Sequence, residues 1–174
     1  MYYSSMESMA QSSCLTCDFS PDRFFCDMSM ESLKALDEIK SLASYPGNAV
    51  LFAERCPVRG IYILCDGRAR LSICSGTGRR LTLRVAGPGE VLGLGAALSN
   101  TPYEITAELL DNSQVVFVGR KNLMKFLREH REARLRIVHI LSQDLHMAYE
   151  RVRTVGAIRT HHPRMVVRPR AMLV

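Results

Sequence analysis

The sequence contains no tryptophan, and only 7% of its 174 residues are aromatic. No hydrophobic run approaches the roughly eighteen residues that a membrane-spanning helix requires, so we expect no membrane association. Residues 1–5 carry neither the basic flank nor the apolar stretch of a signal peptide, which predicts a cytoplasmic protein. With 47% hydrophobic and 23% charged residues, wholesale disorder is excluded and a globular fold is expected.

Acidic residues are absent after Glu150, and the charge of the chain is unevenly divided. Up to Val118 there are 10 basic and 13 acidic residues, whereas from Gly119 onward there are 13 basic and 4 acidic residues. A polyanionic partner and a solvated basic tail are both consistent with this excess of positive charge in the last third.

Three segments differ in their hydrophobic pattern. Ser29 is predicted to cap a short helix with Glu31 in its first turn and apolar residues at helical spacing, ended by Pro46-Gly47. Apolar residues of this helix are Leu33, Leu36, Ile39 and Leu42. Short β-prone runs punctuated by glycine follow from Ala49 to Val118 and indicate a sandwich or barrel. These runs are 50–52, 61–64, 69–73, 81–85, 105–107 and 115–118.

A long helix is predicted after a short one at residues 123–127. Residues 131–155 lack glycine and proline, and apolar residues within them follow one another at spacings of three or four. This seam consists of Ile137, Leu141, Leu145, Ala148, Val152 and Val155. A helix of that length extends roughly 37 Å, so a second copy of it is the natural partner.

No catalytic constellation stands out. A metal held by histidines on barrel strands is excluded, because the first histidine is His130, after the last predicted strand. His139 and His146 are interpreted as solvated residues of one helix, and Gly76–Arg80 as a hairpin turn rather than a phosphate-binding loop. We therefore predict that the protein is not an enzyme and has no firm metal site.

Several motifs occur in an order that resembles the Crp/Fnr regulators. They are Tyr45-Pro46-Gly47, the run Gly60–Gly67, the run Leu83–Gly93 and the helix that extends to Gly156. The resemblance covers about residues 26–156 and implies a mostly β fold with flanking helices: a cyclic-nucleotide-binding-type jelly-roll barrel followed by a long dimerisation helix.

The resemblance divides the chain into four parts. It implies a cysteine-containing mobile leader (1–27), a sensor barrel with its N-terminal helix (28–130), a dimerisation helix (131–156) and a basic tail (157–174). The tail stands where the family continues with a helix-turn-helix, and Pro163 and Pro169 within it leave no room for two helices and a turn. DNA binding is therefore expected only if a helix-turn-helix is restored.

The effector pocket departs from the cyclic-nucleotide binders of the family. The resemblance places the pocket at Gly89, Glu90, Gly93, Leu94, Glu104 and Ile105. Leu94 stands where a glutamate would meet the ribose, and Glu104-Ile105 stand where an Arg-Ser pair would meet the cyclic phosphate. A carboxylate repels a phosphate, so we expect no useful affinity for cAMP or cGMP. The effector is a small molecule or a redox signal that the sequence does not identify.

The N-terminal cysteines Cys14, Cys17 and Cys26 resemble the cysteine cluster of Fnr-type oxygen sensors. That likeness implies an iron–sulfur cluster, but the third cysteine is more distant than in those sensors and Val116 occupies the place of the fourth ligand. Cys56, Cys65 or Cys74 could substitute for that ligand, although the strand-like surroundings of Cys65 and Cys74 favour buried structural thiols. A cluster, a thiol redox switch and inert cysteines all remain open, and no cofactor is firmly predicted.

Two functions fit these features. The first is a homodimeric effector-sensing and dimerisation module of a Crp/Fnr-type transcriptional regulator, with Leu141, Leu145, Ala148, Val152 and Val155 at the dimer interface. The alternative is a stand-alone interaction protein that heterodimerises with full-length regulators through the same helix. The presence or absence of an attached helix-turn-helix in the cell discriminates between them.

Overall fold

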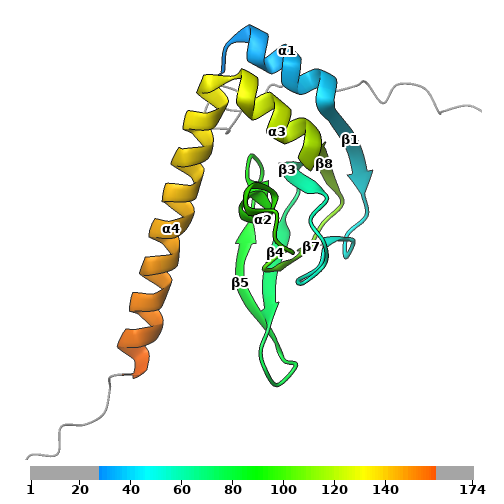
Figure 1. Ribbon diagram of the computed structural model, residues 1–174. Helices are drawn as coiled ribbons and strands as arrows, with labels where there is room; N and C mark the ends of the chain where they lie inside the picture. Colours follow the sequence, from blue (N-terminus) through cyan, green and yellow to red (C-terminus); the bar gives the residue numbers. More distant parts are fainter. Residues whose placement is uncertain (1–27, 160–174) are drawn as a thin grey trace, which may run out of the picture. The chain divides into compact units, whose positions relative to one another are not determined.

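The computed structural model describes residues 28–159, which form four helices and two four-stranded sheets (Figure 1). The helices are α1 (Met30–Ile39), α2 (Leu94–Ser99), α3 (Arg120–Glu129) and α4 (Arg131–Arg159). The strands are β1 (Lys40–Tyr45), β2 (Val50–Phe52), β3 (Gly60–Asp66), β4 (Ala69–Cys74), β5 (Arg80–Ala86), β6 (Val91–Leu92), β7 (Thr106–Leu109) and β8 (Ser113–Gly119). Within this range no helix combines the length and hydropathy that a membrane span requires.

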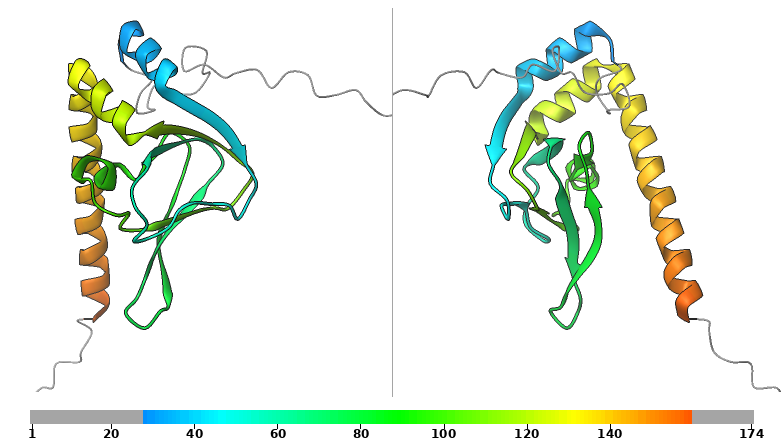
Figure 2. Two further views of the ribbon diagram at one scale, coloured as in Figure 1. Left: turned by 45° about the vertical axis from the view of Figure 1, so that its right-hand side comes forward. Right: turned by 180° about the vertical axis from the view of Figure 1, so that it is seen from behind.

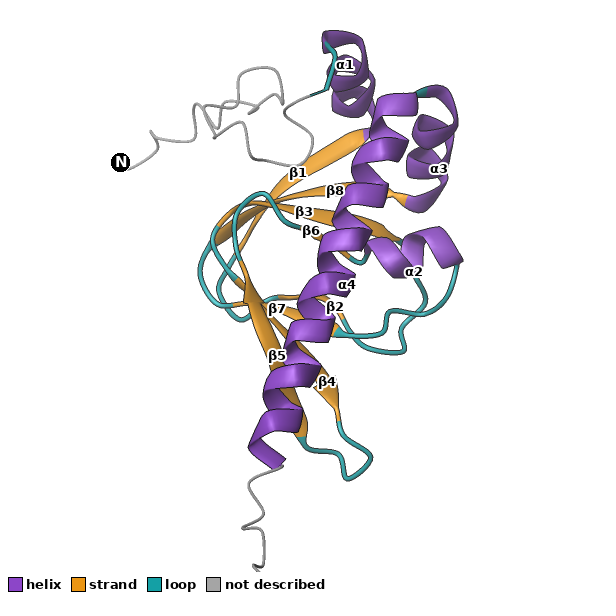
Figure 3. Ribbon diagram, turned by 90° about the vertical axis from the view of Figure 1, so that its left-hand side faces the viewer, coloured by secondary structure: helices purple, strands orange, loops and turns teal. Residues whose placement is uncertain are grey.

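The two sheets confirm the predicted jelly-roll barrel (Figure 3). One has the order β1-β8-β3-β6 and the other β2-β7-β4-β5, and all neighbouring strands are antiparallel. Leucines, alanines and aromatic residues from both sheets form one core. The β4–β5 hairpin turns at Ser75–Arg79, as predicted, and extends past its neighbours in both views of Figure 2.

The first helix is shorter than predicted. Ser29 caps α1, since its hydroxyl accepts a hydrogen bond from the Ser32 amide at 3.3 Å. The helix ends at Ile39, however, and residues 40–45 form β1, which pairs with β8 from Lys40↔Val118 to Tyr45↔Ser113. The predicted extension of the helix to Leu42 is wrong, because pairing along β8 overrides the local helical spacing.

Two short elements between residues 90 and 100 were not predicted. β6 has only two residues, and α2 begins after Gly93, whose φ is 78°, and ends at Asn100, whose φ is 58°. Elements this short carry too few apolar positions to display a period.

The chain forms two compact units, and the first one ends at Ile137. Its part of α4 is firmly packed, since Ala133 and Ile137 are buried. The second unit begins at Val138 and contains the rest of α4, so the predicted long helix is confirmed, with an end at Arg159 rather than Gly156.

Candidate functional site

The predicted effector residues lie in two neighbouring parts of the first unit. Gly89 and Glu90 form the turn before β6, and this turn is bound to β3: the Gly89 amide donates to the Leu64 carbonyl at 2.6 Å, and the Leu64 amide donates to the Glu90 carbonyl at 3.0 Å. Gly89 has a φ of 90°, which explains why glycine stands there.

The carboxylate of Glu90 is fully engaged. One oxygen accepts a hydrogen bond from the Gly87 amide at 2.7 Å, and the other forms an ion pair with the half-buried Arg84 guanidinium. The charge of the Arg84 guanidinium is therefore balanced by a neighbouring carboxylate in this conformation.

The segment from Gly93 to Ile105 joins β6 to β7 through α2. Leu94 is buried and Ile105 is half-buried against the core, whereas Glu104 is exposed. These three positions supply two apolar side chains and one carboxylate, and none of them supplies a cation.

Tyr103 holds this segment in place and was not predicted from the sequence. Its buried hydroxyl accepts hydrogen bonds from the amides of Arg59 at 3.2 Å and Gly60 at 3.3 Å, and donates to the Gly60 carbonyl at 2.8 Å. Its ring lies so close to Gly93 that a Cβ there would approach Tyr103 Cε1 to 2.8 Å. An isolated tyrosine after a proline in a loop carries no sequence signal that distinguishes it from a surface residue.

Aromatic rings occupy the interior beneath this segment. Phe52 stacks on Tyr103 at a centroid distance of 4.2 Å, and Tyr62 contacts Phe52 at 5.5 Å and Phe117 at 5.0 Å. Burial, followed by the neighbouring Tyr103 and Tyr45 hydroxyls, raises the pKa of Tyr62 to about 12. The phenol of Tyr62 therefore loses its proton only at strongly alkaline pH.

A polar cluster joins α1 to the start of α4. Both Ser29 and Ser32 donate hydroxyl hydrogen bonds to Glu132, and the Ser29 amide donates to the same carboxylate at 3.0 Å. His130 Nδ1 lies 2.8 Å from the Ser32 hydroxyl. The hydroxyl of Ser29, then that of Ser32, lowers the pKa of Glu132.

An open hollow of about 550 Å³ borders this cluster and is also lined by Glu31, Arg131 and Leu135. His130 is the only residue between α3 and α4, and Arg134 donates to the Leu127 carbonyl at 2.7 Å across that junction. The cluster therefore holds the start of α4, at Glu132, against α1 within the first unit.

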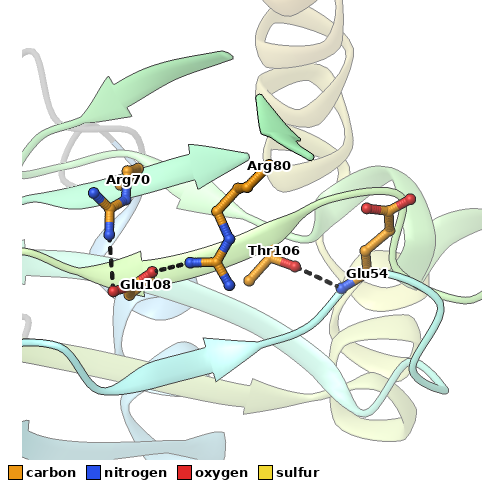
Figure 4. A network of polar contacts seen from close by, with 5 residues as sticks. All are labelled: Glu54, Arg70, Arg80, Thr106 and Glu108. Atoms are coloured by element: carbon orange, nitrogen blue, oxygen red, sulfur yellow. Dashed lines mark hydrogen bonds and ion pairs between the residues drawn. The ribbon is translucent and has the colours of Figure 1, made fainter. Parts of the chain in front are cut away.

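A second polar network lies on the β2-β7-β4-β5 sheet (Figure 4). Glu108 pairs with Arg70 at 2.9 Å and with Arg80 at 2.6 Å, and the hydrogen bond from Arg70 lowers the pKa of Glu108. The Glu54 amide donates to the Thr106 hydroxyl at 3.0 Å. These contacts link β7 to β4, to β5 and to the residues after β2, and they stabilise the sheet across its strands.

The exposed apolar residues of α4 form a stripe. Val138, Leu141, Leu145 and Val152 are exposed, and together with Ala148 they alternate at spacings of three and four. The predicted start of the seam at Ile137 is wrong: Ile137 is 5% exposed and belongs to the core of the first unit, whereas Val138 is 61% exposed. Val155 lies in α4, but its side chain is outside the described residues.

The predicted cysteine ligands cannot be placed, because Cys14, Cys17 and Cys26 lie outside the described residues, as does the tail beyond residue 159. Cys56 and Cys74 are exposed and Cys65 is half-buried, so the expectation of buried thiols at Cys65 and Cys74 is wrong. Cys74 ends β4 at the exposed hairpin, where the strand leaves the core. Among residues 28–159, no group of three or more His, Cys, Asp and Glu residues is placed to hold a metal ion.

Comparisons with known proteins converge on one domain type. Residues 42–130 match the family model of the cyclic nucleotide-binding domain. The structure is similar to the Catabolite Activator Protein of Thermus thermophilus (TM-score 0.68, 19% identity, 76% of this chain and 62% of that chain). It is also similar to the sensor domain of the transcriptional regulator DNR from Pseudomonas aeruginosa (TM-score 0.61, 22% identity, 73% of this chain and 85% of that chain). At sequence identities this low, the similarity shows a shared fold only.

A curated protein matches a shorter stretch. The Patatin-like phospholipase domain-containing protein 6 of Pongo abelii is 27% identical over 84 residues, which are 48% of this chain and 6% of that protein. The chain thus spans only a small part of this relative, and also less than two thirds of the Thermus protein.

Proposed function

Because the chain belongs to the cyclic nucleotide-binding domain family, we propose that it is the effector-sensing and dimerisation module of a Crp/Fnr-type transcriptional regulator, that it acts as a homodimer, and that it does not respond to cAMP. The observation that carries this proposal is the pairing of a sensor-type barrel with a long helix whose exposed apolar stripe has coiled-coil spacing. In this proposal residues 28–130 are the sensor, and residues 131–156 form the dimerisation helix.

The stripe on α4 supports the dimer. Leu145 is 53% exposed and Val152 is 70% exposed in the single chain, and five apolar positions follow one another over four turns. Apolar side chains at this spacing are stabilised by packing between the side chains of a second helix. A second copy of α4 offers the same spacing, so a two-fold interface is self-complementary.

Analytical ultracentrifugation tests the dimer. Leu145→Glu places a carboxylate in the centre of the stripe, and we expect the dimer dissociation constant to rise by roughly 100-fold or more. Met147→Glu is the matched control, because Met147 is an exposed apolar residue of the same helix that lies off the stripe. An unchanged mass for Leu145→Glu, or equal dissociation by both variants, refutes the assignment.

Three features of the predicted effector residues and their neighbours support the absence of a cAMP response. Leu94 is buried and apolar, Glu104 presents a carboxylate, and Arg84 is already paired with Glu90. Titration calorimetry with cAMP and with cGMP tests this part of the proposal. We expect no saturable heat, and saturable binding in the micromolar range by either nucleotide contradicts it.

A further inference from the structure

Ser72 on β4 is a polar residue that is buried as deeply as the hydrophobic core. It is 1% exposed, although it is not a core residue: Leu71 and Ala107 pair with each other in the core, and successive side chains of a strand point to opposite faces. Among residues 28–159, the Ser72 hydroxyl has no hydrogen-bond partner. A buried hydroxyl without a partner is unfavourable, so its position points to a ligand outside the chain.

Two further donors without an acceptor lie beside Ser72. Arg70 is on the same face of β4, and its buried Nε–H has no partner within residues 28–159, while its Nη2 binds Glu108. Thr106 on β7 pairs directly with Ser72, which places their Cβ atoms about 5 Å apart. The Thr106 hydroxyl accepts from the Glu54 amide at 3.0 Å, and no acceptor for its own proton is found in the described part of the chain. Three donors thus gather at one place on the sheet.

Arg80 covers these donors. It pairs with the last residue of β4, yet its guanidinium reaches Glu108, which pairs with Arg70 four residues earlier on β4. The side chain of Arg80 therefore extends along the sheet across the level of Ser72 and Thr106, and Figure 4 shows its guanidinium between Glu108 and Thr106. The Arg80 side chain is half-exposed, and an ion pair with an exposed partner contributes little to stability. Arg80 can therefore leave Glu108 at small cost and uncover the donors.

The charges around the donors favour an anion. Arg70 and Arg80 share one carboxylate, that of Glu108, so these three groups carry a net positive charge. The carboxylate of Glu54 points away from them in Figure 4 and accepts a hydrogen bond from the Cys74 amide at 2.6 Å. Guanidinium and hydroxyl donors that lack acceptors form the type of site that binds phosphate and sulfate oxygens.

We propose that this face of β4 and β7 binds one small oxyanion of the phosphate or sulfate class, held by Arg70 Nε–H and by the hydroxyls of Ser72 and Thr106. Arg80 moves from Glu108 to the bound anion and closes the site. Without the anion, Arg80 returns to Glu108 and covers the donors, which is the conformation seen in the structure. None of the predicted effector positions takes part, so the inference is independent of the proposed function.

Titration calorimetry of the full chain with sodium phosphate, and separately with sodium sulfate, tests the site at an ionic strength held constant with sodium chloride. We expect one anion per chain, and about tenfold weaker binding in Ser72→Ala, as for the loss of a hydrogen bond to a charged group. Ser113→Ala is the matched control, because Ser113 is also buried but its hydroxyl donates to the Asp111 carbonyl at 2.8 Å. Its affinity is expected to be unchanged. No saturable binding of either anion, or an equal loss in both variants, overturns the proposal.

Thermal unfolding separates a binding role of Ser72 from a structural one. In phosphate-free buffer Ser72→Ala removes an unpaired hydroxyl, so its Tm stays unchanged or rises, whereas Ser113→Ala loses a hydrogen bond and unfolds at a lower temperature. Phosphate is expected to raise the Tm of the unaltered chain more than that of Ser72→Ala. A loss of Tm in phosphate-free Ser72→Ala as large as in Ser113→Ala shows that the hydroxyl already has a partner within the protein, and overturns the proposal.

Arg70→Lys tests the second donor. Lysine keeps the positive charge beside Glu108 but has no Nε–H in the plane of a guanidinium, so we expect phosphate to bind about tenfold more weakly. Arg79→Lys is the matched control, because Arg79 is an exposed arginine of the adjacent hairpin, and its affinity for phosphate is expected to be unchanged. Equal affinities of the two variants for phosphate contradict the role of Arg70.

Discussion

Replacement of Gly60 by alanine is expected to destabilise the first unit strongly. A Cβ on Gly60 would approach the Val118 carbonyl oxygen to 2.1 Å and the Phe117 ring to 2.9 Å. The obstacle is backbone of β8, which is paired with β3 on one side and β1 on the other and cannot move without disturbing both pairs. Overpacking in a core costs about 1–3 kcal/mol, and an obstacle of backbone places this variant near about 3 kcal/mol.

Gly76→Ala is the matched control for this prediction. No heavy atom lies within 4 Å of a Cβ at Gly76, and its φ is not positive, so its stability is expected to change by less than about 0.5 kcal/mol. Urea unfolding followed by far-UV circular dichroism, at one fixed protein concentration, measures both variants. A chain of this size loses about 2–4 °C in Tm per kcal/mol, so Gly60→Ala lowers Tm by roughly 6–12 °C. A difference between the two variants below about 0.5 kcal/mol refutes the close approach of β3 and β8.

Three further changes have expected outcomes. Because the pKa of Tyr62 is raised to about 12 in the folded chain, stability is unchanged below pH 10 and falls as the pH rises from 10 to about 12; Tyr62→Phe flattens this alkaline limb in chemical denaturation. Because Arg70 lowers the pKa of Glu108, the stability from this pair is present above the ordinary glutamate pKa and is lost as the pH falls below it; an acid limb equally steep in Glu108→Gln contradicts the ion pair. Ser29→Ala removes the cap of α1 and the hydroxyl contact with Glu132, and is expected to cost at least about 1 kcal/mol in thermal unfolding, with the exposed Ser44→Ala as comparison; a loss no greater than that of Ser44→Ala argues against these contacts.

The parts of the fold that follow from local pattern were predictable. The strands at 61–64 and 115–118 and the long helix are marked by period and by glycine turns, and Ser29 is a cap of the preferred type. β1 was not predictable, because Leu42 continues the helical spacing and only its pairing opposite Val116 makes it a strand. Ile137 and Val138 are equally apolar neighbours, and packing alone decides which of them is buried.

The candidate site was predictable at its glycines and less so at its side chains. Gly89 and Gly93 both have positive φ, which agrees with their place in the motif that resembles the family. Tyr103 acts through contacts with Gly60, more than twenty positions away along the chain. Such contacts leave no periodic mark in the sequence.

In the first unit, helices and strands that follow one another directly have fixed orientations relative to each other. α1 continues into β1 and β8 continues into α3 with no residue between them, and β1 and β8 pair at six positions. A slip of one residue would turn every side chain of β1 to the opposite face of the sheet. The pairing of β1 with β8 therefore also fixes the rotation of α1 and α3 about their own axes. Inserting one residue between Ile39 and Lys40 would rotate α1 by about 100° about its axis and carry Ser29 and Ser32 away from Glu132. The number of residues between α1 and β1 is therefore constrained as strictly as the identity of the residues on either side.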